Sequence, residues 1–144
     1  MAGHKLSAKV EEEIVFMEHL VVECGTISRR VEEYATATKH LESAVQQITR
    51  SLSQIRQRAM MKNLGAVADY AGMLGVQASR GSQLQRTRTL REGVTNFKVM
   101  LERVMKATIA ADLRVRAEAE KGFAADRAER AAVQAAAPTK EGAS

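Results

Sequence analysis

The sequence contains no tryptophan, a single proline, a single cysteine and only 3% aromatic residues. A β-sandwich or β-barrel relies on aromatic and β-branched side chains and on frequent turns, which one Pro and nine Gly do not supply. One cysteine also excludes an intramolecular disulfide and any metal site with several Cys ligands. These shortages leave an all-α protein as the expected fold class.

Long apolar runs are missing as well. Nothing approaches the roughly 18 consecutive apolar residues of a transmembrane helix, and residues 1–13 carry charges where a signal peptide needs its apolar segment. The 45% hydrophobic and 27% charged residues form an ordinary soluble balance. For 144 residues we expect one domain plus a tail, in a soluble cytoplasmic protein without a transmembrane segment.

Apolar residues alternate at spacings of four and three along two stretches, which is typical of a coiled-coil seam. The first seam comprises Leu41, Val45, Ile48, Leu52, Ile55 and Ala59, and is continued backwards by Thr38, Tyr34, Val31 and Ile27. The second seam comprises Leu90, Val94, Phe97, Leu101, Val104, Thr108, Ala111 and Val115. Two matched seams in one short chain predict that they bury each other. The alternative is two independent amphipathic helices that each pack elsewhere.

The strongest turn signal lies between the seams, at residues 79–82. Gly81 suits the positive φ of a helix C-terminus, and Ser82 is a good N-cap for the next helix. A reversal here predicts an antiparallel hairpin that places Leu52 opposite the Val104–Ile109 region. An arm of about 50 residues would be about 75 Å long.

Two interruptions are expected on the N-terminal side of that turn. Gly25 costs about 1 kcal/mol inside a helix, and the apolar phase changes beside it, so we predict a first helix from Ser7, its N-cap, to Cys24. The phase changes again after Ala59, which predicts a bend near residues 63–65.

The predicted architecture is a long antiparallel helical hairpin, coiled-coil-like, with a packed N-terminal helix over residues 1–116. Residues 117–144 form an Ala-rich helical extension and a disordered tail, because Pro138 ends any helix. One pair of helices cannot enclose every apolar residue of the second seam, so self-association is expected to complete the bundle. The predicted interaction residues, which combine this seam with its uncovered face, are Val94, Phe97, Met100, Leu101, Met105 and Ile109.

Charge is distributed unevenly along the chain. The net charge is −3 over residues 1–42, +9 over residues 43–116 and −1 over residues 117–144. The basic middle block either pairs with the acidic first helix, within or between subunits, or binds an external anion such as nucleic acid or a membrane surface. The first interpretation is favoured. The basic patch that raises the question comprises Arg50, Arg56, Arg58, Arg80, Arg86, Arg88 and Arg91.

Sequence patterns for catalysis and metal binding are absent. Neither His19 nor His40 is followed within the next turns by the Lys of a phosphotransfer histidine, and neither is preceded at three residues by the Glu that a di-iron bundle requires. The glycines near residue 72 lack the ending of a phosphate-binding loop. We expect no catalytic residues, no metal and no cofactor. A stripe of small residues predicts either close helix packing or a docking groove beside Met60, Met61 and Met73, and the first interpretation is favoured. The stripe comprises Gly65, Ala68, Gly72 and Gly75.

The function expected from these features is that of a non-enzymatic structural or adaptor protein, a scaffold acting through helix–helix association. The expected partner is a second copy of the chain, and a different helical protein is the other possibility. Two alternatives remain open: an Arg-rich architectural nucleic-acid-binding protein, and a peripheral protein that coats lipid or granule surfaces through amphipathic helices.

Overall fold

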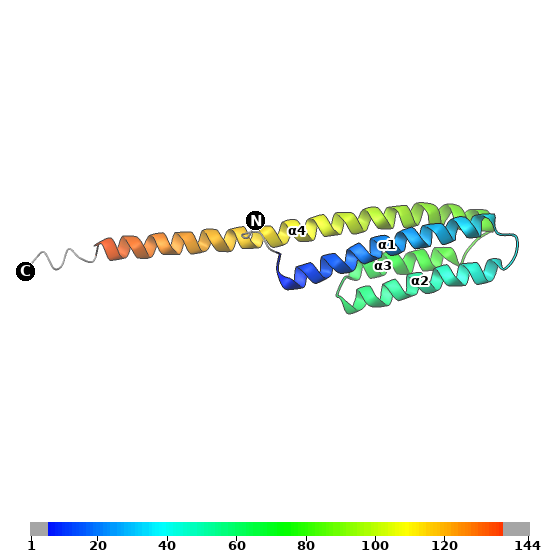
Figure 1. The fold of residues 1–144 in the computed structure, drawn as a ribbon, viewed down its shortest axis with the longest axis horizontal. Coiled ribbons are helices and arrows are strands. Elements are labelled where there is room, and N and C mark those ends of the chain that lie inside the picture. Colours follow the sequence, from blue (N-terminus) through cyan, green and yellow to red (C-terminus); the bar gives the residue numbers. More distant parts are fainter. Residues whose placement is uncertain (1–5, 137–144) are drawn as a thin grey trace, which may run out of the picture.

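The computed structural model describes residues 6–136, which form four helices and, within that range, no strand. The helices are α1 (Ala8–Thr36), α2 (Leu41–Met61), α3 (Gly65–Ala78) and α4 (Gln83–Ala136). Consecutive helices run antiparallel, and α4 closes the arrangement by packing on α1 as well as on α3 (Figure 1). The predicted all-α class is confirmed, as a helical bundle.

Helix α1 is continuous through Gly25, so the predicted break after Cys24 is wrong. The side of α1 that contains Gly25 faces solvent, whereas Cys24 and Ile27 on either side are buried. Burial along the whole helix outweighs the roughly 1 kcal/mol cost of one exposed glycine. Leu20 rather than Val21 occupies the core position, which keeps the phase; the buried residues are Ile14, Met17, Leu20, Cys24, Ile27, Val31 and Tyr34.

Ser7 caps α1 as expected. Its hydroxyl accepts a hydrogen bond from the backbone N–H of Val10 at 3.3 Å, and Glu11 lies in the first turn, where a negative charge suits the helix dipole.

The chain reverses at two places before the predicted turn. Residues 37–40 separate α1 from α2, and residues 62–64 separate α2 from α3. Each reversal uses a non-glycine residue at positive φ, His40 at 57° and Asn63 at 58°. The second confirms the bend predicted near residues 63–65. The first divides the expected 50-residue arm, so its residues belong to three separate helices.

The turn at residues 79–82 has the predicted chemistry. Gly81 has a φ of 89°, in the left-handed region that favours glycine. The Ser82 hydroxyl accepts from the Gln85 N–H at 3.2 Å, and the Gln85 side-chain oxygen accepts from the Ser82 N–H at 3.0 Å. This reciprocal pair is a capping box, which begins α4 here.

The α2 seam and the first half of α4 contribute to one core, but each of these helices packs on α1 and α3. The prediction that the two seams bury each other directly is therefore wrong. Phe97 is fully buried, and its ring centroid lies 5.2 Å from that of Tyr70 on α3. Helices α3 and α4 approach closely at Gly93, whose carbonyl accepts a hydrogen bond from the Tyr70 hydroxyl at 3.2 Å. A Cβ at position 93 would overlap the Cδ2 atom of Leu74, which is itself fully buried.

Opposite effects are expected from adding a methyl group at two glycines. Gly93→Ala should destabilise the fold by about 1–2 kcal/mol, because overpacking against Leu74 outweighs the gain in helix propensity. Gly25→Ala should stabilise it by about 0.5–1 kcal/mol, since nothing lies within 4 Å of the added Cβ. Urea unfolding followed by circular dichroism measures both. A destabilised Gly25→Ala would contradict the open space beside Gly25, and a stabilised Gly93→Ala would contradict the close approach of α3 and α4 at Gly93.

Candidate interaction surface

The second half of α4 projects beyond the bundle as a single helix (Figure 1). We call residues 115–136 the free segment; its 22 residues extend about 33 Å. Every residue from 117 to 133 is exposed, including Phe123 at 67% and Val133 at 69%. The predicted Ala-rich extension is helical as far as the structure describes it, up to Ala136. The expected helix stop at Pro138 and the predicted tail lie outside the described residues.

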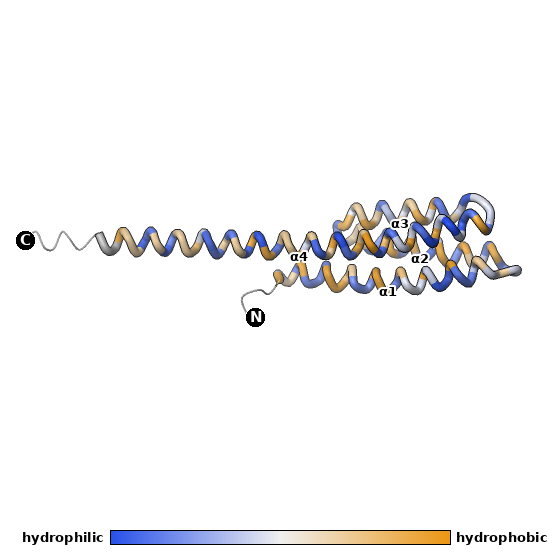
Figure 2. The backbone as a smooth tube through the Cα atoms, turned by 90° about the horizontal axis from the view of Figure 1, so that it is seen from above, coloured by the Kyte–Doolittle hydropathy of each residue, from blue (hydrophilic) through white to orange (hydrophobic). Residues whose placement is uncertain are grey.

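The bundle ends level with Asp112. The backbone N–H of Ser7, immediately before α1, donates to the Oδ2 atom of Asp112 at 3.0 Å. At the other end of α1, the Gln83 side-chain amide donates to the carbonyl of Tyr34 at 2.8 Å. Helix α1 is therefore antiparallel to α4 and covers it from residue 83 to residue 112 (Figure 2).

The core-facing side of α4 continues onto the free segment. Phe97, Val115 and Val133 follow one another at intervals of 18 residues, which is five full turns at 3.6 residues per turn. Phe97 points into the core, so Val115 and Val133 lie on the same line of the helix. Val115 is nevertheless 65% exposed, because the N-terminal end of α1 lies beside Asp112 and α1 does not reach Val115. The same line of α4 is thus buried at Phe97, within the bundle, and exposed at Val115 and Val133, beyond it.

Polar residues interrupt this line in the middle of the free segment. Asp126 and Arg130 lie between Phe123 and Val133 and form an ion pair one turn apart, at 3.3 Å. Such an exposed pair adds a few tenths of a kcal/mol to the helix. At 100° per residue, Asp126 lies within about 20° of the line, whereas Phe123 lies about 80° to one side of it. The line is therefore apolar at its two ends, Val115 and Val133, and polar between.

The predicted interaction residues lie mainly inside the bundle. Val94, Phe97 and Leu101 are buried in the core. Met100, Met105 and Ile109 are partly buried and pack against it. Helices α1 and α3 supply this cover. The apolar residues of α4 that stay exposed include Val99, at 47%, and those of the free segment.

The predicted basic patch is spread over several elements. Arg50, Arg56 and Arg58 are on α2, whereas Arg86, Arg88 and Arg91 are on α4; these two helices occupy opposite corners, since each packs on both α1 and α3. Arg80 lies in the turn before α4.

Three of these arginines pair with acidic residues of α1 and α2. Arg58 contacts Glu23 at 2.7 Å, Arg91 contacts Glu32 at 2.6 Å, and Arg86 contacts Glu42 at 3.4 Å. The hydrogen bonds from Arg91 lower the pKa of the Glu32 carboxyl. This is the pairing between acidic and basic parts of the chain that the charge distribution favoured, within one subunit.

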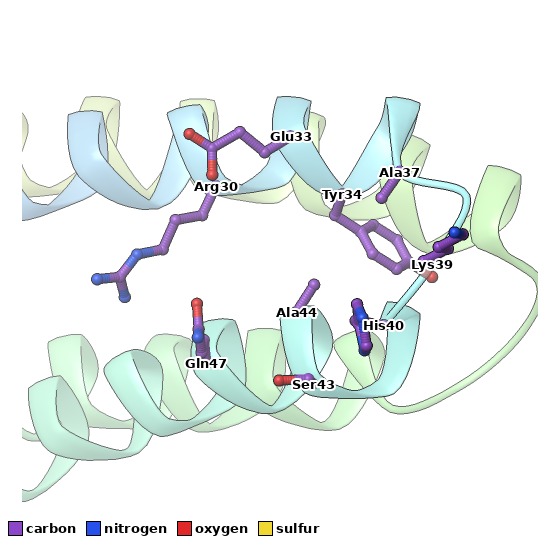
Figure 3. Close-up of a pocket in the computed structure, with 9 residues that line it drawn as sticks. All are labelled: Arg30, Glu33, Tyr34, Ala37, Lys39, His40, Ser43, Ala44 and Gln47. Carbon is purple, nitrogen blue, oxygen red and sulfur yellow. The ribbon is translucent and has the colours of Figure 1, made fainter.

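A small hollow lies beside the turn between α1 and α2, with a volume of about 220 Å³ (Figure 3). Arg30 and Glu33 line it from α1, and Lys39 and His40 from the turn. Arg30 also donates to the hydroxyl of Ser51 at 2.8 Å. The charged groups that line the hollow are of both signs, so the hollow offers no strongly positive or negative site. Within residues 6–136, no group of three or more His, Cys, Asp or Glu residues is arranged to hold a metal ion.

The small-residue stripe of α3 permits close packing. A Cβ at position 72 would lie 3.2 Å from the Cδ atom of Arg56, so Gly72 lets the Arg56 side chain cross α3. Ala68 is buried in the core, and Gly75 borders a groove of about 300 Å³ between α2 and α3. Met60, Met61 and Met73 are exposed. Close packing thus accounts for Gly72 and Ala68, and a docking role for the groove stays a prediction.

Cys24 is 1% exposed in the core, as its apolar phase predicted. Burial raises the pKa of its thiol to about 11, so the group stays protonated and unreactive at neutral pH.

Comparison with protein-family models, with curated proteins and with solved structures finds no match to this chain. Among the described residues, no helix is both long and apolar enough to cross a membrane. The candidate interaction surface therefore rests on the geometry of this chain.

Proposed function

We propose that the protein is a non-enzymatic structural or adaptor protein that works through helix–helix association, with the free segment of α4 as its contact surface and a second copy as its partner. The observation that carries this proposal is the core-facing line of α4, which continues past the bundle with Val115 and Val133 exposed, while Phe123 is exposed to one side of it.

The energetics of a lone helix support the proposal. In proteins, most of the stability of a helix comes from the packing of an apolar face rather than from intrinsic propensity, and residues 117–133 are exposed within the chain. The bundle nucleates the free segment, because α4 is one uninterrupted helix. Alanine then propagates it at low cost. A second helix along its apolar line would provide the missing packing.

Sedimentation of the purified chain at micromolar concentration tests the proposal, with a dimer mass or more as the expected result. The triple change Val115→Ser, Phe123→Ser and Val133→Ser should raise the dimer dissociation constant by about tenfold or more. The matched control carries serine at three exposed valines of the bundle, Val15, Val22 and Val99. A wild-type chain that stays monomeric, or equal loss in the control, would contradict association through the free segment.

Architectural nucleic-acid binding is the second candidate. Its support is the formal net charge of +5 and the four patch arginines that form no ion pair within residues 6–136, which are Arg50, Arg56, Arg80 and Arg88. Titration of duplex DNA tests it, since phosphate binding weakens steeply with added salt. Absence of binding at low salt would exclude this function.

A further inference from the structure

We infer that the free segments of two copies pair antiparallel, so that Val115 of each copy faces Val133 of the other. This inference rests on the proposed function and specifies its partner, direction and register. It follows from where the bundle ends, from the room that the bundle leaves, and from the spacing of residues along α4.

The bundle leaves room for only one direction of pairing along this line. Before residue 112, the core-facing side of α4 is occupied by its own α1 and α3. A parallel second helix on the same line would run into that bundle within one or two turns. An antiparallel helix places the second bundle at the opposite end, beyond residue 136. The antiparallel helix of the second copy also runs in the same direction as α1. It covers the core-facing line of α4 beyond the point where α1 stops covering this line.

The spacing of the two valines sets the register. Facing Val115 against Val133 puts the two-fold axis level with residue 124. The same axis brings residue 136, the last described residue of α4, level with residue 112, where the Ser7–Asp112 hydrogen bond marks the beginning of α1. In this register, residues 112–136 of one copy lie alongside the whole described length of α4 that α1 leaves uncovered in the other.

The axis passes near small side chains. Gly122 and Asp126 face each other across it, and no atom lies within 4 Å of a Cβ built on Gly122. Two helices can approach closely there.

The flanks of such a pair carry like charges. Glu118 of one copy lies beside Glu129 of the other along one edge, and Arg116 lies beside Arg130 along the opposite edge. In the single chain, Arg116 is 3.7 Å from Asp112, and Arg130 is paired with Asp126. Repulsion between exposed like charges is weak and is screened by salt. The dimer should therefore be of modest affinity and should become tighter as salt rises, in contrast to nucleic-acid binding.

Disulfide cross-linking of the full-length chain tests the register. One preparation carries Val115→Cys and a second, distinguishable by a mass tag, carries Val133→Cys. Mixed and oxidised with copper phenanthroline, they should give a cross-linked heterodimer, because the two Cα atoms approach disulfide distance. Neither preparation alone should cross-link, since equivalent positions of the two copies are about 27 Å apart. The native Cys24 does not compete, because it is buried.

A second pair of variants is the matched control. Ala117→Cys and Ala131→Cys have the same axial register but lie on the opposite side of the helix, so their mixture should stay unlinked. Cross-linking of Val115→Cys with itself would show parallel pairing and overturn the inference. A chain that sediments as a dimer without the heterodimeric cross-link would overturn the register and leave helix association standing. A chain that is monomeric would overturn both.

Discussion

Replacing Phe97 with alanine is expected to lower the free energy of unfolding by about 3–5 kcal/mol. The ring is fully buried where α4 meets α3, and it stacks at a tilt of 36° against Tyr70. Its removal loses apolar burial and the aromatic contact, and it leaves a cavity that close-packed neighbours fill only in part. Because the chain contains no tryptophan, far-UV circular dichroism during urea unfolding is the appropriate measurement.

Phe123→Ala is the control for this change. It removes the same ring from the same helix, but Phe123 is 67% exposed on the free segment. At protein concentrations where the chain is monomeric, we expect a change below about 0.5 kcal/mol. Similar losses for both variants would contradict the division of α4 into a core half and a free half.

Leu52→Ala should cost about 2–4 kcal/mol. Leu52 is fully buried at the centre of the α2 seam, between Ile48 and Ile55, and Val104 of α4 packs against the same core. Met61→Ala is the control, since it shortens an apolar side chain of the same helix at a position that is 83% exposed. Calorimetric or urea unfolding compares the two. A loss below about 0.5 kcal/mol for Leu52→Ala would remove this residue from the core.

The parts of the fold that the sequence predicts well depend on neighbours along the chain. The α2 seam has the expected spacing, and its buried residues are Val45, Ile48, Leu52, Ile55 and Ala59. The caps at Ser7 and Ser82 form hydrogen bonds within one helical turn, and Gly81 provides the local φ that the last turn needs. Each of these features is decided by residues no more than four positions apart, so the pattern alone reveals them.

The turn at residues 37–40 was missed because its stabilisation comes from a distant part of the chain. No glycine or proline marks this turn, and His40 adopts positive φ in its place. The exposed carbonyls at the end of α1 are satisfied by the Gln83 amide, which bonds Tyr34 and also Ala37 at 2.9 Å. An interaction across more than 40 positions leaves no local signal. Because the sequence pattern does not reveal the reversal at residues 37–40, it predicts one long arm where the structure has separate helices.

The candidate interaction surface was obscured for a similar reason. Heptad spacing indicates that Phe97 and Val115 belong to one seam, but it does not show where cover by another helix stops. That point is set by the start of α1 beside Asp112, a tertiary contact. The sequence therefore assigned the interaction to residues such as Val94 and Leu101, which the chain buries itself.

The uninterrupted course of α4 has a consequence for how a bound partner would be held. As a flexible linker, the same 22 residues would have a root-mean-square length of about 23–28 Å and point in every direction. As a continuation of a core helix, they form a stiff rod whose axis is fixed by the packing of Phe97 and Leu101. When a partner binds such a rod, the free segment loses little orientational freedom relative to the bundle, so the entropic cost of binding is small. The distance and angle between the bundle and anything bound to α4 are therefore set when the bundle folds.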